Sequence, residues 1–454
     1  MKKETIETYA RAQVPRYTSY PTAAQFSSAV NGDLVTQWAS RLNDDARLSL
    51  YFHVPFCRSM CWYCGCHTKI SRKDGPLISY AQTLERELES SALAFANGRS
   101  GPRQVVSVHW GGGTPSLLPE ESFRDIVETM RSCYSVADDA EHAMELDPRL
   151  VDEPLVAKIA DAGINRVSLG VQDFTPRVQA AIGRVQPFEQ VAAAVGLLNR
   201  AGLKAMNFDL IYGLPLQSRA DLIRSIDLAV GLSPGRIALF GYAHVPWFKK
   251  HQRMIDEAAL PGPMERLDMA EAAAERLVTL GYRRIGIDHF ARPDDALAIA
   301  AENGTLRRNF QGYTTDPADA VIGLGASSIS SFPGGFAQNA PATAEWARAV
   351  DAGRLATVRG VATTAEDRFR SALIEALMCN LTVDVAAVAS SHGINTACLG
   401  PWRRHIDELA ADGLAVRSGN TIRVLEEARA FARMVAAVFD AYLEPEAKKH
   451  SVAV

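Results

Sequence analysis

The chain has 454 residues, of which 47% are hydrophobic and 22% are charged, and its formal net charge is −4. This length accommodates one large domain plus a smaller one, and the composition is ordinary for a globular protein. The small negative charge gives no basis for nucleic-acid binding, and no apolar run approaches the length of a membrane span. The N-terminal segment has neither an apolar stretch nor a cleavage site, so we expect a cytoplasmic protein.

The first 36 residues form a predicted N-terminal arm. It contains Val14–Thr22, a segment dense in aromatic and hydroxyl side chains that also carries Arg16. Such a segment either covers hydrophobic surface or acts as a lid over an active site.

Strand-like runs then alternate with helix-like segments. The expected strands are Arg47–Pro55, Val105–Trp110, His142–Leu146, Arg166–Val171, Ala205–Tyr212 and Arg236–Tyr242. The expected helices between them are Leu77–Asn97, Pro119–Tyr134, Asp152–Ala162, Glu189–Ala201 and Arg219–Leu232. This alternation predicts a parallel sheet with right-handed crossovers, and six such units can form an open, partial barrel. A helix at Met264–Leu280 and strands at Tyr282–His289 and Val321–Ser330 are expected to follow.

The pattern changes after about residue 360. Helices are expected at Asp367–Met378, Trp402–Ala411 and Leu425–Tyr442, with a hairpin at Gly413–Val424. We therefore predict a barrel domain over residues 37–360 and a small, mostly helical domain over 361–454. No basic recognition helix is present, which favours packing against the barrel over DNA binding.

Four of the seven cysteines lie within ten residues, at Cys57, Cys61, Cys64 and Cys66. The first three have the spacing C-x3-C-x2-C, which leaves one iron of a cubane cluster without a protein ligand. They follow the predicted strand that ends at Pro55, where α/β barrels place their reactive groups. The motif therefore indicates an iron–sulfur cluster with an open iron that a small molecule can bind.

Other uses of these cysteines are disfavoured. Zinc sites generally have two separated cysteine pairs, and Cys133, Cys379 and Cys398 are isolated. Disulfides need an oxidising compartment, and an electron-transfer cluster needs a fourth cysteine from elsewhere in the chain. Cys66 is too close to Cys64 to serve easily as that fourth ligand.

Polar and glycine residues follow the ends of successive predicted strands. They are the turn Trp110–Pro115, which contains three glycines, and then Glu145, Asp147, Gln172, Arg184 and Asp209. Glycines let the backbone approach a ligand and expose N–H groups, although a plain tight turn is an equally good interpretation. Asp147 precedes a proline and is expected to cap the following helix. Together these residues predict a ligand site beside the cysteine loop.

At this point the chain resembles the radical S-adenosylmethionine (SAM) enzymes and, more narrowly, the oxygen-independent coproporphyrinogen III oxidases of haem synthesis. The motifs that carry the resemblance are Arg16–Thr22, Tyr51–Cys57, Cys61–Cys66, Trp110–Pro115, Gly170–Asp173, Asp288–Asp294 and Asn309–Tyr313. The resemblance covers nearly the whole chain. It implies a partial (β/α)6 barrel of the TIM type with extra strands, an N-terminal arm and a small helical C-terminal domain.

The resemblance also implies roles for individual residues. Cys57, Cys61 and Cys64 would ligate a 4Fe–4S cluster whose free iron binds one SAM. That SAM would contact Tyr51, Tyr63, Gly112, Glu145 and Ile329. A second SAM would contact Gly113, Thr114, Gln172, Arg184, Asp209 and Ala243. Cys66 and His53 would lie near the cluster or the substrate.

The implied reaction is the anaerobic conversion of coproporphyrinogen III to protoporphyrinogen IX by a monomeric enzyme. A 5′-deoxyadenosyl radical made from SAM would take hydrogen from a propionate β-carbon, and loss of CO2 and one electron would leave a vinyl group. Two propionates would react in this way. Arg16 is our candidate for binding the substrate's carboxylates. The electron donor and the electron acceptor cannot be identified from the sequence.

Two positions depart from the family pattern. His67 stands where a smaller polar residue is expected, and the tail His450–Val454 lacks the aromatic and basic residues that relatives carry. The main alternative function is a haem chaperone of the same superfamily, which resembles this chain less at Cys66 and at Arg16–Thr22. A zinc-stabilised α/β protein without redox activity is a third possibility.

Overall fold

The computed structural model describes residues 3–96 and 101–443. The predicted departure at His450–Val454 lies outside the described residues. None of the helices in the described ranges is both long and apolar enough to cross a bilayer.

The centre of the molecule is a twelve-stranded open sheet with the order β16-β15-β14-β13-β1-β4-β5-β6-β7-β8-β10-β9. The six predicted barrel strands are present and parallel: β1 (Leu48–Val54), β4 (Gln104–Gly112), β5 (Ser135–Leu146), β6 (Arg166–Gln172), β7 (Ala205–Tyr212) and β8 (Arg236–Gly241). A seventh parallel strand, β13 (Ala320–Leu324), pairs with β1 on its other side. The sheet is therefore the expected partial barrel extended by further strands at both edges.

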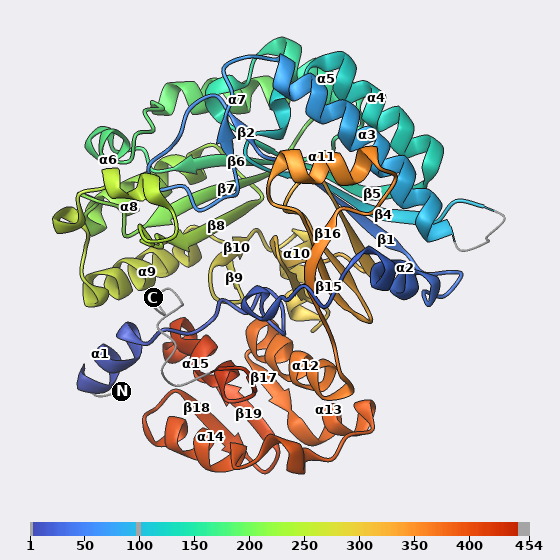
Figure 1. Cartoon of the computed structure of the whole chain (residues 1–454). Helices are drawn as coiled ribbons and strands as arrows, with labels where there is room; N and C mark the ends of the chain where they lie inside the picture. The colour runs from blue at the N-terminus through green and yellow to red at the C-terminus, as the bar shows by residue number, and fades with distance from the viewer. Residues whose placement is uncertain (1–2, 97–100, 444–454) are drawn as a thin grey trace.

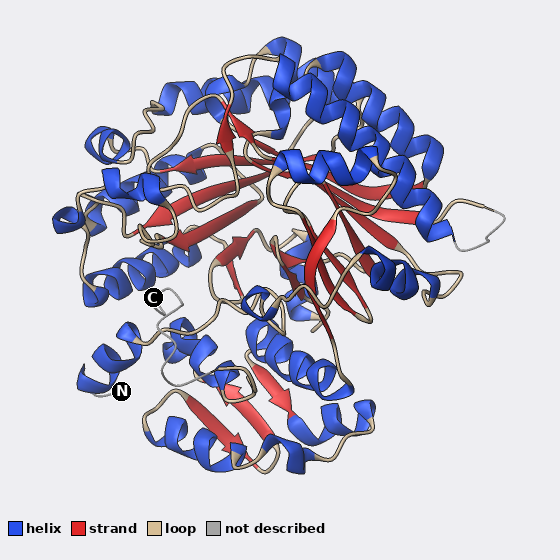
Figure 2. Ribbon diagram, in the orientation of Figure 1, coloured by secondary structure: helices blue, strands red, loops and turns tan. Residues whose placement is uncertain are grey.

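Helices connect the parallel strands and cover the outer face of the sheet (Figures 1 and 2). They are α3 (Gly75–Ala96), α4 (Glu120–Cys133), α5 (Glu153–Asp161), α6 (Pro176–Ala181), α7 (Phe188–Arg200) and α8 (Arg219–Gly231), and α9 (Pro263–Thr279) follows β8. The largest hydrophobic core lies between these helices and the sheet. Strand–helix alternation in the sequence thus corresponds to two packed layers.

Side chains along each parallel strand alternate between this core and the barrel interior. In β6, Val167, Leu169 and Val171 are fully buried against the helices. Ser168 and Gly170, on the opposite face of β6, line a cavity. Burial of the apolar face of each strand therefore determines which polar side chains face the barrel interior.

Two strands predicted as continuous are each divided by a turn, so these two predictions are wrong. Tyr282–His289 contains β9 (Arg283–Ile285) and only the start of β10 (His289–Ala291), with Gly286 between them at φ 54°. Val321–Ser330 contains most of β13 and the start of β14 (Ile329–Phe332), with Gly325 at φ 94° and Ser327 at φ 67° between them. Residues in the left-handed region reverse the chain, and the neighbouring strands then pair antiparallel.

Antiparallel strands and short helices complete this half of the chain. The strands are β15 (Gly335–Asn339) and β16 (Thr357–Ala362) at the sheet edge, with β11 (Arg307–Asn309) and β12 (Gly312–Thr314) as a separate hairpin. The helices are α1 (Lys3–Arg11) and α2 (Gly32–Ser40) before β1, α10 (Ala296–Glu302) after β10, and α11 (Thr343–Asp351) after β15. The two-stranded β2 (Phe56–Cys57) and β3 (Lys69–Ile70) bracket the cysteine loop.

The C-terminal lobe has a hydrophobic core of its own and lies below the barrel in Figure 1. It contains α12 (Ala365–Asn380), α13 (Val385–His392), α14 (Trp402–Ala411) and α15 (Ala432–Ala437). The predicted hairpin is confirmed as β18 (Ala415–Ser418) and β19 (Thr421–Val424), and β17 (Thr382–Asp384) adds a third strand that the sequence did not predict. The helix predicted at Leu425–Tyr442 is shorter, because a 3-10 segment precedes α15.

The N-terminal arm packs between the two lobes. The side chains of Ala10, Tyr17 and Tyr20 belong to the core of the C-terminal lobe. The Tyr17 hydroxyl donates to Asp440 Oδ2 at 3.0 Å, and the Tyr9 hydroxyl donates to Asp412 Oδ2 at 2.6 Å. The domain boundaries at residues 36 and 360 stay predictions.

Tyr80 on α3 links the end of β1 to the turn after β13. Its hydroxyl donates to the carbonyl of His53 at 2.7 Å and accepts from the N–H of Ala326 at 2.9 Å. The ring stacks on Trp346 with a centroid separation of 4.5 Å. These contacts hold the segment that leads into the cysteine loop.

We predict that Tyr80→Phe lowers the free energy of unfolding by about 2 kcal/mol, because it leaves a buried N–H and a buried carbonyl without their partner. Urea denaturation of the anaerobic protein measures this change. Tyr134→Phe is the matched control: Tyr134 is equally buried, and its hydroxyl has no hydrogen-bond partner among the described residues. Equal midpoints for the two variants would contradict the linking role of Tyr80.

Candidate active site

The cysteine loop lies at the carboxyl end of β1. Phe56–Cys57 pairs in parallel with Lys69–Ile70, so the intervening residues form a closed loop over the barrel opening. Cys61 is buried, Cys57 and Cys64 are half-buried, and Cys66 is exposed. No disulfide joins any of the seven cysteines, all of which lie within the described residues.

Cationic and hydroxyl groups surround the first three thiols. The hydroxyl of Thr114 donates to Cys57 Sγ at 3.5 Å, and Thr68 Oγ1 lies 3.3 Å from the same sulfur. Arg184 Nη1 donates to Cys61 Sγ at 3.5 Å. The hydrogen bond with Cys66 lowers the pKa of Cys64 to about 6. Burial raises the pKa of Cys57 in spite of its two hydroxyl contacts, so among these thiols the thiolate, the form that binds metal, is favoured at Cys64.

The three sulfurs line one cavity of about 560 Å³. Within the described ranges, no three Cys, His, Asp or Glu side chains converge on a point where a single metal ion could bind. Tetrahedral zinc needs all its ligands within about 2.3 Å of one ion, whereas each cysteine of an iron–sulfur cluster binds a different iron. Three cysteines on one cavity are a set of donors that an iron–sulfur cluster can use, because each needs to reach only its own iron.

The glycine turn after β4 packs tightly against its neighbours. A Cβ atom on Gly112 would lie 2.7 Å from His53 Cε1, and Gly112 has φ 114°. A Cβ atom on Gly113 would lie 2.6 Å from the carbonyl oxygen of Phe56. Both glycines also line the cavity. The interpretation as a tight turn and the interpretation as a ligand site are therefore compatible.

Glu145 faces the cavity from β5. Its Oε2 accepts from the N–H of Gly112 at 3.2 Å, and its Oε1 lies 3.4 Å from His109 Nε2. Burial alone would raise the pKa of Glu145, but these partners lower it below its ordinary value. Glu145 therefore stays ionised and presents an acceptor to a ligand.

His53 forms a hydrogen bond to the backbone of the cysteine loop. Its Nε2–H donates to the carbonyl of His67 at 3.0 Å, so Nδ1 is left to accept from the Tyr51 hydroxyl at 3.0 Å. Burial lowers the pKa of His53 to about 4, which keeps the ring neutral. The ring of His67 donates in turn to the carbonyl of Pro341 at 2.8 Å, so His67 attaches the loop to the residues before α11.

Arg184 lines the same cavity as Glu145. It is 7% exposed, donates to the carbonyl of Gly170 at 2.8 Å, and contacts Asp147 at 3.3 Å. Asp147 also caps the next turn, as predicted, by accepting from the N–H of Arg149. Gln172 beside them has φ 66°, an uncommon conformation for a residue with a side chain. This conformation coincides with a register shift between Gly170 and Gln172 in the pairing of β6 with β7.

Asp209 lies deeper in the barrel. It accepts from Ser168 Oγ at 3.0 Å and from Asn207 Nδ2 at 2.8 Å. Burial, followed by the charge of Glu145, raises its pKa to about 6. Asp209 can therefore change protonation state near neutral pH.

The segment after β8 contacts the cysteine loop, which the sequence analysis did not predict. Lys249 Nζ donates to the carbonyl of Cys66 at 2.9 Å, and His251 donates to that of Cys64 at 2.7 Å. Gln252, 1% exposed, donates to the carbonyls of Tyr63 and Ala243. The only sequence signal is the polar run Lys249–Gln252, which lies beyond the sixth barrel strand.

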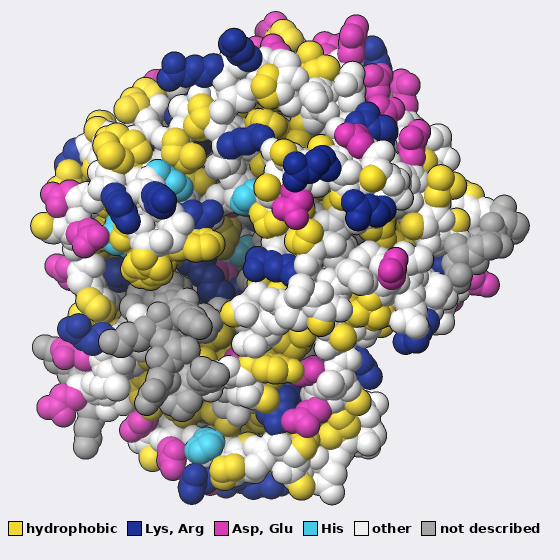
Figure 3. Space-filling view, viewed as in Figure 1, with side chains coloured by type: hydrophobic (Ala, Val, Ile, Leu, Met, Phe, Trp, Pro, Cys, Tyr) yellow, Lys and Arg dark blue, Asp and Glu magenta, His cyan; other side chains and the backbone are white. Residues whose placement is uncertain are grey.

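The predicted site residues divide between two cavities. The 560 Å³ cavity is lined by Cys57, Cys61, Tyr63, Cys64, Cys66, Gly112, Gly113, Thr114, Glu145, Gln172, Arg184, Asp209, Ala243 and Arg16. Tyr51, His53 and Ile329 instead line a neighbouring cavity of about 1,080 Å³. Gly65 lines both cavities, and the space-filling view shows Lys, Arg and His side chains within the hollow between the lobes (Figure 3).

Comparisons with known proteins give one result. The Radical SAM superfamily model matches residues 51–229. The chain is 44% identical to the oxygen-independent coproporphyrinogen III oxidase of Bradyrhizobium diazoefficiens, with 100% of both chains covered. It is 44% identical to the enzyme of the same name from Paracoccus denitrificans, with 98% of this chain and 97% of that one covered. The structure of coproporphyrinogen III oxidase (HemN) from Escherichia coli, a radical SAM enzyme, matches with a TM-score of 0.89 at 35% identity, covering 95% of this chain and 100% of that chain.

Proposed function

Because the chain belongs to the oxygen-independent coproporphyrinogen III oxidases of the radical SAM superfamily, we propose that it decarboxylates two propionates of coproporphyrinogen III. The products are two vinyl groups, as in protoporphyrinogen IX, and two CO2. The observation that carries the assignment is full-length similarity to named oxidases, combined with three thiols at the opening of a parallel barrel. The haem-chaperone alternative is not favoured by these relatives.

We propose Cys57, Cys61 and Cys64 as the ligands of a 4Fe–4S cluster. When bound, the cluster and SAM supply a 5′-deoxyadenosyl radical that can take hydrogen from a propionate β-carbon. The chain itself positions the sulfurs: Thr114 and Thr68 contact that of Cys57, and Arg184 contacts that of Cys61. Cys66 is exposed and hydrogen-bonded to Cys64, which suits a neighbour of the cluster more than a ligand.

We propose that the cavity walls bind SAM through complementary charges. The ionised carboxylate of Glu145 offers an acceptor to an ammonium or hydroxyl group, and Arg184 offers a cation to a carboxylate. Gln172 and Asp209 add further polar groups to the lining of this cavity. The expected contacts of the second SAM all line the 560 Å³ cavity, whereas those of the first SAM are divided, with Tyr51 and Ile329 in the 1,080 Å³ cavity. Two SAM molecules stay part of the proposal on the family resemblance.

The overall reaction needs groups that the chain does not supply. Each propionate loses one hydrogen atom, CO2 and one electron, so an external donor and an external acceptor must exchange electrons with the site. We propose a monomeric enzyme that meets these two partners at its surface.

The assignment predicts turnover under anaerobic conditions. Incubation with SAM, a reductant and coproporphyrinogen III is expected to release two CO2 for each protoporphyrinogen IX, with formation of 5′-deoxyadenosine, which chromatography and labelled carboxyl carbon both measure. Stoichiometric haem binding without any decarboxylation would replace this assignment with the chaperone function.

The cysteine assignment predicts a sharp division among single variants. Cys57→Ser, Cys61→Ser and Cys64→Ser are each expected to lose nearly all activity and most bound iron after anaerobic reconstitution, because serine is a poor ligand for iron–sulfur clusters. Cys66→Ser is expected to retain its iron, as is Cys398→Ser, whose exposed thiol lies in the C-terminal lobe. Full activity in any of the first three variants would refute the ligand set.

A further inference from the structure

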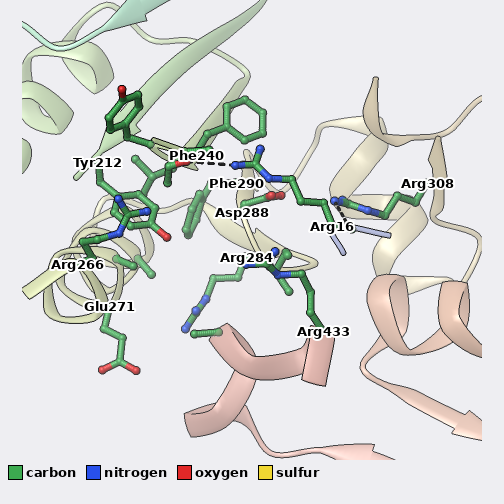
Figure 4. Close-up of a pocket in the computed structure, with 18 residues that line it drawn as sticks. Arg16, Tyr212, Phe240, Arg266, Glu271, Arg284, Asp288, Phe290, Arg308 and Arg433 are labelled. Carbon is green, nitrogen blue, oxygen red and sulfur yellow. Dashed lines mark hydrogen bonds between the residues drawn. The ribbon is translucent and has the colours of Figure 1, made fainter. Parts of the chain in front are cut away.

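A small arginine-lined pocket lies where the barrel, the arm and the C-terminal lobe meet. Five arginines from five separate segments surround it: Arg16 in the arm, Arg266 on α9, Arg284 on β9, Arg308 on β11 and Arg433 on α15 (Figure 4). Residues this far apart in the sequence share a pocket only because the fold brings them together.

The lining of this pocket contains fewer acidic side chains than arginines. Its lining contains two carboxylates, Asp288 and Glu271, and Glu271 points away from the other charged side chains in Figure 4. Asp288 accepts from His289 Nδ1 at 2.7 Å. Beyond the lining, Arg284 meets Glu426 at 3.5 Å. The pocket therefore holds more guanidinium groups than carboxylates.

Two of the five arginines are deeply buried. Arg266 and Arg433 are only 9% and 7% exposed. Desolvation, followed by the charge of Arg16, lowers the pKa of Arg433 to about 10. Solvent screens a buried guanidinium less than an exposed one, so these side chains attract an anion in the pocket more strongly.

Arg308 has an N–H available for such an anion. Its Nε donates to the carbonyl of Tyr17 at 3.2 Å, and its Nη2 donates to that of Arg16 at 3.3 Å. Its Nη1 is buried without a hydrogen-bond partner among the described residues. The two backbone contacts fix the guanidinium, while the third nitrogen has no acceptor.

The size and position of the pocket restrict its occupant. A volume of about 80 Å³ corresponds to roughly two to three water molecules in liquid, which admits a carboxylate but not a macrocycle. Arg16 and the segment Phe240–Ala243 also line the 560 Å³ cavity, and Arg308 also lines the 1,080 Å³ cavity. A tetrapyrrole in the larger cavities could therefore extend a side chain into the pocket.

We propose that Arg16, Arg266, Arg308 and Arg433 bind a propionate carboxylate of the substrate that is retained in the product. The proposal rests on the proposed function. Loss of CO2 removes the negative charge from a carboxylate, so guanidinium groups that stabilise that charge oppose decarboxylation. The pocket therefore suits an anchoring propionate, while the reacting propionates lie towards the cysteine cavity.

The test measures binding and turnover with the reconstituted, anaerobic holoenzyme. Coproporphyrin III, the fluorescent oxidised form with four carboxylates, reports affinity, and its tetramethyl ester serves as the uncharged probe. Arg16→Gln and Arg308→Gln are each expected to weaken coproporphyrin III binding and raise KM by roughly tenfold to a hundredfold, with a much smaller change in kcat. Neither variant should alter binding of the ester.

Two controls separate a specific loss from damage to the fold. Arg219→Gln removes an exposed arginine that pairs with Asp268 outside the pocket, and it is expected to match the wild type. Iron content and thermal midpoint confirm that each pocket variant is folded. Arg433→Lys, which keeps the buried charge, is expected to be less impaired than Arg433→Gln if both remain folded.

The outcomes distinguish this proposal from the proposed function. Wild-type turnover combined with unchanged Kd and KM in Arg16→Gln and Arg308→Gln would overturn the anchoring site and leave the enzyme assignment intact. Arginine-dependent porphyrin binding without wild-type turnover would instead overturn the enzyme assignment. If the variants weaken binding of inorganic phosphate but not of coproporphyrin III, the pocket is a general anion site and the proposal fails.

Discussion

The parallel register of the barrel strands is the constraint on which the site depends. Tyr51 lies opposite His109, Glu145 opposite Ser168, and Gly170 opposite Asp209. The intervening residues are apolar and packed against the helices. A shift of one residue in any strand would move its polar side chains into that core and its apolar side chains into the cavity. Burial of the outer face therefore sets the positions of the polar groups inside the barrel.

The cysteine loop depends much less on apolar packing and much more on hydrogen bonds to its backbone. His53 binds the carbonyl of His67, and Lys249 and His251 bind the carbonyls of Cys66 and Cys64. Arg184 attaches Cys61 to the end of β6 through Gly170. The contacts of His53, Lys249 and His251 fix the loop through its backbone, whereas Arg184 contacts the sulfur of Cys61. The three sulfurs line the cavity.

The C-terminal lobe and the arm contribute charge as well as hydrophobic burial. Tyr17 and Tyr20 place the arm in the core of that lobe, which brings Arg16 to the carbonyl of Gly241 at 3.3 Å. Asp288 responds to the same environment: burial would raise its pKa, but the hydrogen bond from His289 and the charges of Arg308 and Arg16 lower it to about 2. The junction of the lobes thus contains interacting charged side chains as well as packed apolar ones.

The sequence by itself determined the six-unit barrel and the cysteine loop at the end of the first strand, because these features rest on local periodicity and spacing. It also indicated the family, through a resemblance carried by motifs along nearly the whole chain. Sequence reasoning also named Glu145, Gln172 and Asp209, whose positions follow from strand ends. It missed the turns at Gly286 and Gly325, where positive φ values divide apparently continuous strands. Three features came only from the tertiary structure. Ile329 and Tyr51 line a second cavity, and the segment after β8 contacts the cysteine loop. Arginines from five segments surround one pocket. These contacts join residues that are distant in the chain, so no local pattern encodes them. Packing within the barrel decides the first two, and packing of the arm and the two lobes decides the third.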